Sequence, residues 1–448
     1  SALGSVLAAP RTLQALAYDR VLPKFLASQL GSKTEPRAAV LLTTGIAVAV
    51  IWMGDLNFVA VIISMFFLNT YGMINLTAGL EKMSGNPSYR PKFKVPGWVS
   101  VLGAAGCYGA MFLINTPATI AAILISFGVF FILERRSMQR TWGDIRSGIW
   151  FTLTRFGLLH LESRRLGPKN WRPNIVVFTG QPYNREHLAD VSEWLSRGRG
   201  VVTFFQLLVG DVDEVSMISH RDAAQKHIKN YIRDRKMAAF SESEIVQDFY
   251  NGALTVVQAH GLGGFIPNTV MFGWSNKPEN LGSQMRLMRS LVYLGKSVMY
   301  LHFDDDRGFG NYKQIDVWWG GKGRNAELML LLAHLISGHR RWHRSKIRVL
   351  RVIQAEEGAE QAQEHIAKIL SDARVEAEPV IIVQDDPDST IGDIIKEYSD
   401  STDLTFLGMQ FPAKEMVAEY GESVNALMES VGTVLMVRSA NIEDILET

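Results

Sequence analysis

The sequence predicts a two-part protein, a bundle of membrane-spanning α-helices followed by a cytosolic α/β domain of two lobes. Long stretches before Glu134 are apolar and carry no charge, whereas charged residues are dense from Glu134 onward. In the later part, short apolar runs alternate with helical patterns, which is typical of parallel sheets with crossover helices. The predicted domains are residues 1–138, a connecting amphipathic segment 139–170, and residues 171–448 with lobes 171–340 and 341–448.

The balance of charge and the cysteine content exclude several function classes. Lys and Arg number 46 and Asp and Glu number 45, so no bulk field attracts nucleic acid. The single cysteine, Cys107, excludes a disulfide scaffold and a Cys-based zinc site.

The membrane part is predicted from charge-free length, because a span needs about 20 mostly apolar residues. The predicted spans are 1–9, 38–54, 56–80, 99–114 and 118–133. The last two are separated at Asn115-Thr116-Pro117, since proline suits the first turn of a helix. The first range looks like the inner end of a span, so we expect a C-terminal part of a longer protein. Buried core helices are the alternative, but adjacent charge-free stretches favour a membrane.

The distribution of Lys and Arg predicts the orientation of these spans. Basic residues fill alternate connections: Arg11, Arg20, Lys24, Lys33 and Arg37, then Lys82, Arg90, Lys92 and Lys94, then Arg135, Arg136 and Arg140. The connections around Asp55 and Asn115 have none. The positive-inside rule therefore places everything after residue 134 in the cytosol.

In the second part we expect strands separated by helices. The predicted strands are 174–178, 201–209, 255–259, 269–272, 297–301, 315–319, 346–353, 378–383, 404–409 and 433–437. The predicted helices are 186–196, 222–235, 360–372 and 390–399. The basic segment 135–169 is either a helix on the inner membrane surface or a linker packed on its own domain.

Four polar clusters in this part are candidate sites, and each also has a purely structural explanation. Asp304-Asp305-Asp306 follows a strand and suits a metal or a solvated acidic loop. Gly261–Gly264 and Gly320–Gly323 lack the spacing of a phosphate-binding loop. His339–Arg344 is a basic cluster that could bind anionic lipid or RNA. The alternative is a solvent-exposed end of a helix. No catalytic spacing occurs, so we predict neither an enzyme nor a cofactor.

Polar side chains inside the spans are the stronger candidates, because burying one in lipid is costly. They are Ser1, Ser5, Thr43, Ser64, Asn69, Thr70, Tyr71 and Asn75. Bonding to the carbonyl four residues earlier, hydrogen bonding between helices, and lining of a pathway all remain open.

Several segments resemble the cation-chloride cotransporter family. Ser1–Ala15 resembles the end of its eighth transmembrane helix and the following inner helix, and Phe66–Asn75 resembles its tenth. Tyr89–Phe93 and Asn170–Pro173 with Phe178–Gly180 follow in family order. Gln258–Gly263 with Pro267–Thr269 and Ile315–Trp319 complete the match, which weakens beyond about residue 340.

The resemblance implies electroneutral symport of chloride with sodium and/or potassium on a broken-helix, inverted-repeat architecture. The chain would supply the end of helix 8 to helix 12. The family's cytosolic domain is similar to universal stress proteins and commonly mediates a homodimer. The ATP loop of those proteins is not evident at Met409–Pro412, so ATP binding is not carried over. The expected partners are the transported ions and the lipid bilayer, and no nucleic acid.

The resemblance also supplies the site residues. Tyr71 matches the tyrosine of the lower chloride site in the family's Phe-Phe-Leu-x-x-Tyr motif, although a tyrosine bonded to a neighbouring helix is the alternative. Ser1 matches the second of two serines found in sodium-coupled members, and this favours sodium dependence. Ser5 and Asn75 are expected to support the pathway. The competing hypothesis is a membrane-anchored scaffold or sensor whose α/β domain binds a nucleotide or protein.

Overall fold

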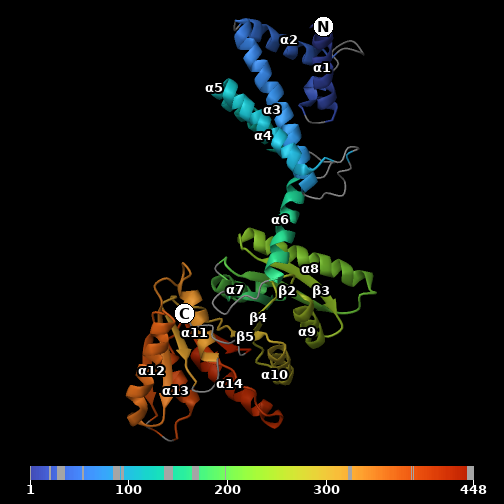
Figure 1. Cartoon of the computed structure of the whole chain (residues 1–448). Helices are drawn as coiled ribbons and strands as arrows, with labels where there is room; N and C mark the ends of the chain where they lie inside the picture. The colour runs from blue at the N-terminus through green and yellow to red at the C-terminus, as the bar shows by residue number, and fades with distance from the viewer. Residues whose placement is uncertain are drawn as a thin grey trace. The chain divides into compact units, whose positions relative to one another are not determined.

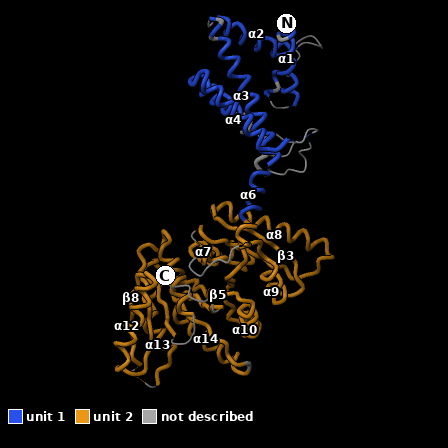
Figure 2. The backbone as a smooth tube through the Cα atoms, in the orientation of Figure 1, with its two compact units in different colours: residues 1–157 blue, residues 158–448 orange. Residues whose placement is uncertain are grey.

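A computed structural model describes the chain in two compact units, residues 1–157 and 158–448 (Figure 2). The residues described are 2–19, 22–27, 36–52, 55–83, 91, 95–135, 145–163, 171–196, 198–320, 325–384, 386 and 388–440. The division falls inside the connecting segment that the sequence predicts at 139–170. Each unit is described below by itself.

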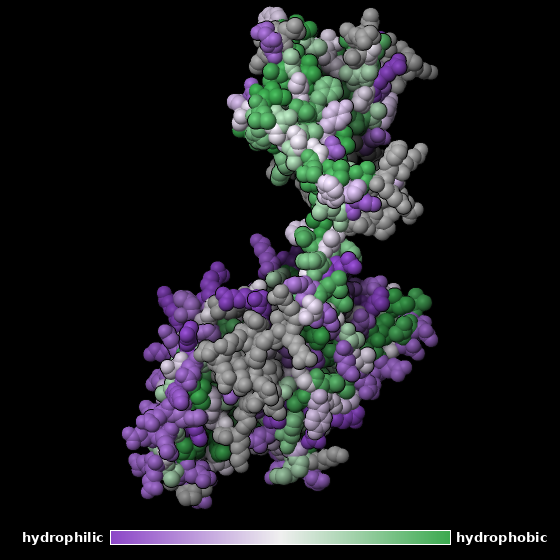
Figure 3. All heavy atoms as spheres, in the orientation of Figure 1, coloured by the Kyte–Doolittle hydropathy of each residue, from purple (hydrophilic) through white to green (hydrophobic). Residues whose placement is uncertain are grey.

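The first unit is helical (Figure 1). Its helices are α1 (Ala2–Tyr18), α2 (Arg37–Trp52), α3 (Leu56–Met83), α4 (Gly97–Ile114), α5 (Thr116–Arg135) and the start of α6 (Ile145–Glu162). Within the described ranges, two segments are both long and apolar enough to cross a membrane, Val59–Met83 and Gly97–Ile114. The apolar parts of α2 and α5 are shorter, Arg37–Trp52 and Thr116–Phe131. Much of the surface that this unit shows in Figure 3 is accordingly hydrophobic.

The break predicted near residue 115 is confirmed. α4 ends at Ile114, and Asn115 is extended with a φ of −160°. Its side-chain oxygen accepts a hydrogen bond from the backbone N–H of Ala118 at 2.9 Å. Pro117 then lies in the first turn of α5, where its missing N–H costs nothing.

Small residues bring α3 and α4 into close contact. A Cβ atom on Gly79 would lie 2.8 Å from a methyl group of Val101, and one on Gly97 would lie 3.2 Å from the carbonyl oxygen of Gly79. Helix association in lipid depends on such close backbone approach. The two glycines therefore set the distance between these helices.

The second unit is built on one ten-stranded sheet with the strand order β3-β2-β1-β4-β5-β10-β9-β6-β7-β8. The strands are β1 (Asn174–Phe178), β2 (Val201–Val209), β3 (Phe240–Val246), β4 (Thr269–Gly273), β5 (Ser297–His302), β6 (Gln314–Trp318), β7 (Lys346–Ile353), β8 (Glu378–Val383), β9 (Leu404–Gly408) and β10 (Val434–Arg438). Neighbouring strands are parallel except β5 and β10, which pair antiparallel.

The sheet consists of two half-sheets of the same topology. Strand order runs 3-2-1-4-5 from β3 to β5, and the same order runs inward from the opposite edge, from β8 to β10. The halves meet where β5 and β10 pair, with Met436 opposite Tyr300. β6 pairs with β7 and β9, so β6 belongs to the second half although we expected it in the first lobe.

Helices connect successive strands and cover both faces of the sheet. They are α7 (Glu186–Ser196), α8 (Val215–Asp234), α9 (Phe249–Ala259), α10 (Pro278–Tyr293), α11 (Asn325–Ser337), α12 (Ala359–Asp372), α13 (Ile391–Ser399) and α14 (Val417–Val431). Helices α7, α8, α11 and α12 share one hydrophobic core with the sheet, and α9, α10, α13 and α14 share the other. The unit is thus a three-layer α/β/α structure.

One predicted strand is wrong, because residues 255–259 form the end of α9. The side chain of Asp248 accepts a hydrogen bond from the N–H of Asn251 and begins the helix there. Ala253 and Val257 then pack into the core on one helical face. Tertiary packing has overridden the strand preference of the Thr-Val-Val run. Strand β3 was not predicted at all, since its alternating Ser and Glu residues resemble a solvated loop.

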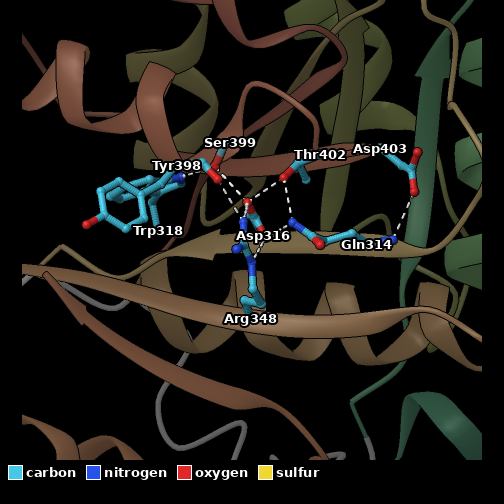
Figure 4. Close-up of polar contacts among 8 residues, drawn as sticks. All are labelled: Gln314, Asp316, Trp318, Arg348, Tyr398, Ser399, Thr402 and Asp403. Carbon is cyan, nitrogen blue, oxygen red and sulfur yellow. Dashed lines mark hydrogen bonds and ion pairs between the residues drawn. The ribbon is translucent and has the colours of Figure 1, made fainter.

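A buried carboxylate holds the second half-sheet together (Figure 4). Asp316 on β6 is 0% exposed and forms a bidentate pair with Arg348 on β7, at 2.9 and 2.7 Å. The hydroxyls of Ser399 and Thr402 also donate to it, at 2.7 and 2.6 Å. The Trp318 indole N–H in turn donates to Ser399 Oγ at 3.0 Å. This network therefore joins β6, β7 and the segment between α13 and β9.

We predict that Asp316→Asn lowers the free energy of unfolding of the second unit by about 3 kcal/mol, because it leaves Arg348 without its counter-ion. Asp222→Asn breaks the exposed Arg221–Asp222 pair and is expected to leave the free energy of unfolding nearly unchanged. Urea denaturation of the chain in mild detergent measures both. Equal losses in the two variants would show that the buried network contributes nothing special.

Candidate functional site

Tyr71 lies on α3 with its side chain 56% exposed in the first unit. Its ring stacks on Phe67, with the ring centroids 6.4 Å apart. Among the described residues, none forms a hydrogen bond with the Tyr71 hydroxyl. The phenol O–H therefore keeps its donor function, and the interhelical bond that we weighed as an alternative is not formed within this part of the chain.

Asn75 lies one turn farther along α3 and is engaged in helix packing. Its side-chain N–H donates to the carbonyl oxygen of Tyr71 at 2.9 Å. A Cβ atom on Gly103 of α4 would lie 3.3 Å from the Asn75 side-chain oxygen. The structure thus brings Asn75 against α4 and ties it to the backbone of Tyr71.

Of the two serines predicted for the ion pathway, only Ser5 lies within the described residues. Ser1 lies outside the described residues. Ser5 lies on α1, and its backbone is helical there. Their roles stay predictions.

Asn69 forms a polar junction that the sequence did not reveal. It is 5% exposed, and its side-chain N–H donates to Ser126 Oγ of α5 at 2.6 Å. The Tyr108 hydroxyl of α4 donates to the Asn69 side-chain oxygen at 3.3 Å. This one amide therefore links three helices. The cost of burying an amide in lipid made Asn69 a candidate in the sequence. No sequence pattern predicted which residues on other helices it would bond.

Two other candidate residues of the spans, Thr43 and Thr70, bond only within their own helix. The Thr43 hydroxyl donates to the carbonyl oxygen of Ala39 at 3.0 Å, and the Thr70 hydroxyl donates to that of Phe66 at 2.8 Å. Such bonding satisfies the hydroxyl without a neighbour. These residues need no pathway role.

The junction fixes the rotation of α3 about its axis. Residues two apart on an α-helix are separated by about 200° around it. Because Asn69 faces α4 and α5, Tyr71 points away from this junction and is 56% exposed, although Asn75, one turn farther along, contacts α4. A polar donor on that side is what an ion-binding surface requires.

We predict that Asn69→Leu destabilises the first unit by about 1 to 2 kcal/mol, since interhelical bonds in membranes contribute about 0.6 to 2 kcal/mol each. Thr70→Val removes a hydroxyl that bonds only to its own helix, so it should leave the melting temperature nearly unchanged. Thermal unfolding of both variants in one detergent measures the difference. If Thr70→Val is as damaging as Asn69→Leu, the junction is not what holds these helices.

In the second unit, the glycines at Gly261–Gly264 serve helix packing. Gly263 has a φ of +60°, and a Cβ atom there would lie 2.8 Å from the carbonyl oxygen of Leu158. A Cβ atom on Gly264 would lie 2.9 Å from the Leu161 side chain. The end of α6 therefore packs directly on this turn. This contact accounts for the glycines, so no bound phosphate is needed to explain them.

The acidic and basic clusters are likewise used within the unit. Asp304 accepts hydrogen bonds from the N–H groups of Asp306 and Arg307, at 2.9 and 3.1 Å, and so closes a turn. No grouping of His, Cys, Asp and Glu suited to a metal occurs in the ranges that the structure describes. Of the second glycine turn, Gly321–Gly323 lie outside the described residues.

The basic segment His339–Arg344 is anchored by Trp342, which is fully buried and packs edge-on against Trp194. The Arg341 guanidinium lies 3.6 Å from the carboxylate of Asp190. Burial raises the pKa of Asp190 against the opposing effect of Arg235 and Arg341. This segment thus ties the connection between α11 and β7 to α7, which is a structural role.

Each half-sheet carries a cavity at the carboxyl ends of its central strands, where strand order reverses. The first, of about 520 Å³, lies beside β1 and β4 and is lined by Phe178, Phe272, Tyr300 and Lys277, among others. The second, of about 710 Å³, lies beside β6 and β9 and is lined by Trp318, Leu407, Tyr420 and Leu427, among others. Ligands of open α/β sheets bind at such positions.

Two family models match the chain. The amino acid permease model matches residues 1–176, and the model of solute carrier family 12 matches residues 185–288 and 302–403. Together they cover both units in the order in which the structure divides them.

Solved structures resemble the second unit at low identity. One is the cytoplasmic domain of a prokaryotic cation chloride cotransporter, at 14% identity over 62% of this chain and 99% of that chain, with a TM-score of 0.47. Another is a universal stress protein from Archaeoglobus fulgidus DSM 4304, at 9% identity over 60% of this chain and 98% of that chain, with a TM-score of 0.40.

Proposed function

Because the chain belongs to the cation-chloride cotransporter family and is part of a membrane transporter, we propose that the complete protein is an electroneutral symporter of chloride with sodium and/or potassium. The observation that supports this proposal most directly is the Tyr71 hydroxyl. It is a neutral donor within residues 56–80 of α3, which carry no charge, and it points away from the Asn69 junction with α4 and α5. The proposal includes a homodimer, whose mass light scattering of the purified protein would measure.

Chloride is the ion that such a donor suits. A phenol O–H points a partial positive charge at an anion without adding a full charge to a low-dielectric site. A lysine or arginine there would be costly to bury and would bind chloride too tightly for turnover. Tyr71 therefore binds chloride in this proposal, and Asn75 supports the backbone on which Tyr71 lies.

The sodium site in this proposal includes Ser1, since hydroxyl oxygens suit a hard cation. Ser5, which lies on α1 four positions later in the sequence, supports the pathway in this proposal. The earlier helices of the complete protein would supply the potassium site and the upper chloride site.

We predict that Tyr71→Phe raises the chloride concentration needed for half-maximal cation uptake about tenfold, because one hydrogen bond to a charged group contributes about 1.5 to 3 kcal/mol. Ser1→Ala is the matched contrast, and it should raise the sodium requirement and leave the chloride requirement unchanged. Uptake of ⁸⁶Rb⁺ and ²²Na⁺ by the complete protein in vesicles measures both.

Two results would contradict this assignment. Wild-type chloride dependence in Tyr71→Phe would remove the chloride role of the hydroxyl. Full chloride-driven uptake in sodium-free medium would remove sodium from the coupling and with it the role of Ser1.

The topology gives a separate prediction. The connection between α2 and α3 lacks Lys and Arg, so it is expected outside, and residues 140–448 are expected in the cytosol. A cysteine at Asn57 in a Cys107→Ala background should react with an impermeant maleimide applied to intact cells. A cysteine at Arg199, in the cytosolic unit, is the control and should react only after permeabilisation. The reverse pattern would invert the membrane arrangement.

A further inference from the structure

The larger of the two cavities lies at the carboxyl ends of parallel strands, at the point where the strand order reverses, which is where α/β sheets commonly bind ligands. β6 begins the second half-sheet, the chain then passes to β7 and β8 on one side and returns to β9 and β10 on the other. The cavity opens beyond the carboxyl ends of β6 and β9, between α13 and α14. Its volume of about 710 Å³ falls in the range of small-molecule sites, which is about 300 to 1,000 Å³.

The walls of this cavity are mainly apolar. Val352, Leu407 and Met436 line it from the strands, and Ile395, Val424 and Leu427 line it from the helices. The Trp318 indole, which the Asp316 network holds in place through Ser399, forms another part of the wall. A ligand that fills this space must therefore have an apolar body.

Two of the polar groups at the cavity are donors that a ligand can use. The Tyr420 hydroxyl accepts a hydrogen bond from the backbone N–H of Gln410 at 3.3 Å, which leaves its own proton for a ligand. Burial raises the pKa of Tyr420, so this proton stays in place at neutral pH. Lys396 also lines the cavity, where it interacts electrostatically with Asp393 without forming an ion pair among the described residues. The remaining charged group, Asp393, is engaged in capping α13 through Thr390.

A second cation, Arg438, lies near Tyr420, although it does not itself line the cavity. Arg438 interacts electrostatically with Tyr420 and donates to the carbonyl oxygen of Met409 at 3.1 Å. Its Nε is buried, and within the described ranges it has neither a hydrogen-bond partner nor a carboxylate neighbour. The guanidinium stacks over the Phe411 ring, 4.3 Å from its centroid, but it has no carboxylate beside it and so leaves a positive potential that an anion would neutralise.

We propose that this cavity binds a small molecule with an apolar body and a single carboxylate, whose carboxylate accepts the Tyr420 hydrogen bond in the positive potential of Lys396 and the nearby Arg438. A polyphosphate is a poor fit, because such groups need a loop with several free backbone N–H groups. β9 ends at a single glycine, Gly408, and the N–H of Gln410 in the turn that follows is already directed to Tyr420. The site is independent of the transport proposed above.

The test uses 4-phenylbutyrate as probe, with 4-phenylbutanol as the uncharged molecule of the same shape. The chain in lipid nanodiscs should bind one phenylbutyrate, about tenfold or more tightly than the alcohol, since a charge-assisted hydrogen bond is about twice as strong as a neutral one. Isothermal titration measures both affinities, and empty nanodiscs give the background from partition into lipid.

Three variants locate the binding. Leu427→Trp fills the cavity and should abolish saturable binding, and Val424→Trp, which fills it from another position, replaces it should the first variant fail to fold. Tyr420→Phe keeps the shape of the ring and should weaken phenylbutyrate about tenfold. Tyr398→Phe, on α13 but outside the cavity, is the matched control and should change nothing.

Several results would overturn the proposal. They are an absence of saturable phenylbutyrate binding, equal affinity for the acid and the alcohol, and binding that survives both tryptophan variants. ATP binding that Leu427→Trp abolishes and phenylbutyrate does not displace would assign the cavity to a nucleotide instead.

Discussion

The ion pair between Asp316 and Arg348 is the constraint on which the second half of the sheet depends. Removing a carboxylate from water costs several kcal/mol unless its oxygens all accept hydrogen bonds. The Asp316 carboxylate is therefore stable in the interior only when all of its donors are in place. They come from β7, from the end of α13 and from the segment before β9. Strand β6 can therefore adopt its register only when the elements on both sides of it are in place. The same network fixes Trp318 through Ser399, and it thereby shapes a wall of the cavity at the other end of β6.

The repeated half-sheet determines which two strands form the edges of the ten-stranded sheet, and both edges are protected against pairing with other chains. The halves join through their fifth strands, so the edge strands of the whole sheet are β3 and β8. Strand β3 carries Glu242 and Glu244, and β8 carries Pro379, which has no N–H to offer another strand. Charge and proline are the usual protection of an exposed edge. The same symmetry produces two points where strand order reverses, and each has a cavity.

The parts of this structure that are encoded locally were predictable from the sequence. Apolar β-branched runs such as Asn174–Phe178 and Lys346–Ile353 predicted their strands, and Asn115 with Pro117 predicted the break between α4 and α5. The resemblance to the transporter family, which the family models confirm, also rested on contiguous motifs. These signals lie within a few residues of one another, so no knowledge of the fold was needed to read them.

The parts that depend on distant partners were not predictable. Asp316 pairs with a residue on another strand and with two hydroxyls more than 80 positions away, and the sequence gives no spacing for such a set. The membership of β6 in the second half-sheet follows from its pairing with β7 and β9, which the linear order of elements hides. The role of Gly263 and Gly264 similarly becomes visible only when the last turn of α6 lies against them.

The polar residues of α3 show how one energetic rule separates structure from function. Lipid penalises every unsatisfied donor, so most polar side chains in a span find a partner inside the protein. Asn69 does so through Ser126 and Tyr108, Thr70 through its own helix, and Asn75 through the carbonyl of Tyr71. The Tyr71 hydroxyl, in contrast, has no partner among the described residues, although it lies between these satisfied neighbours. The Tyr71 hydroxyl is thus open to a partner from outside the described residues, and the chloride ion proposed above is one that would fit a neutral O–H.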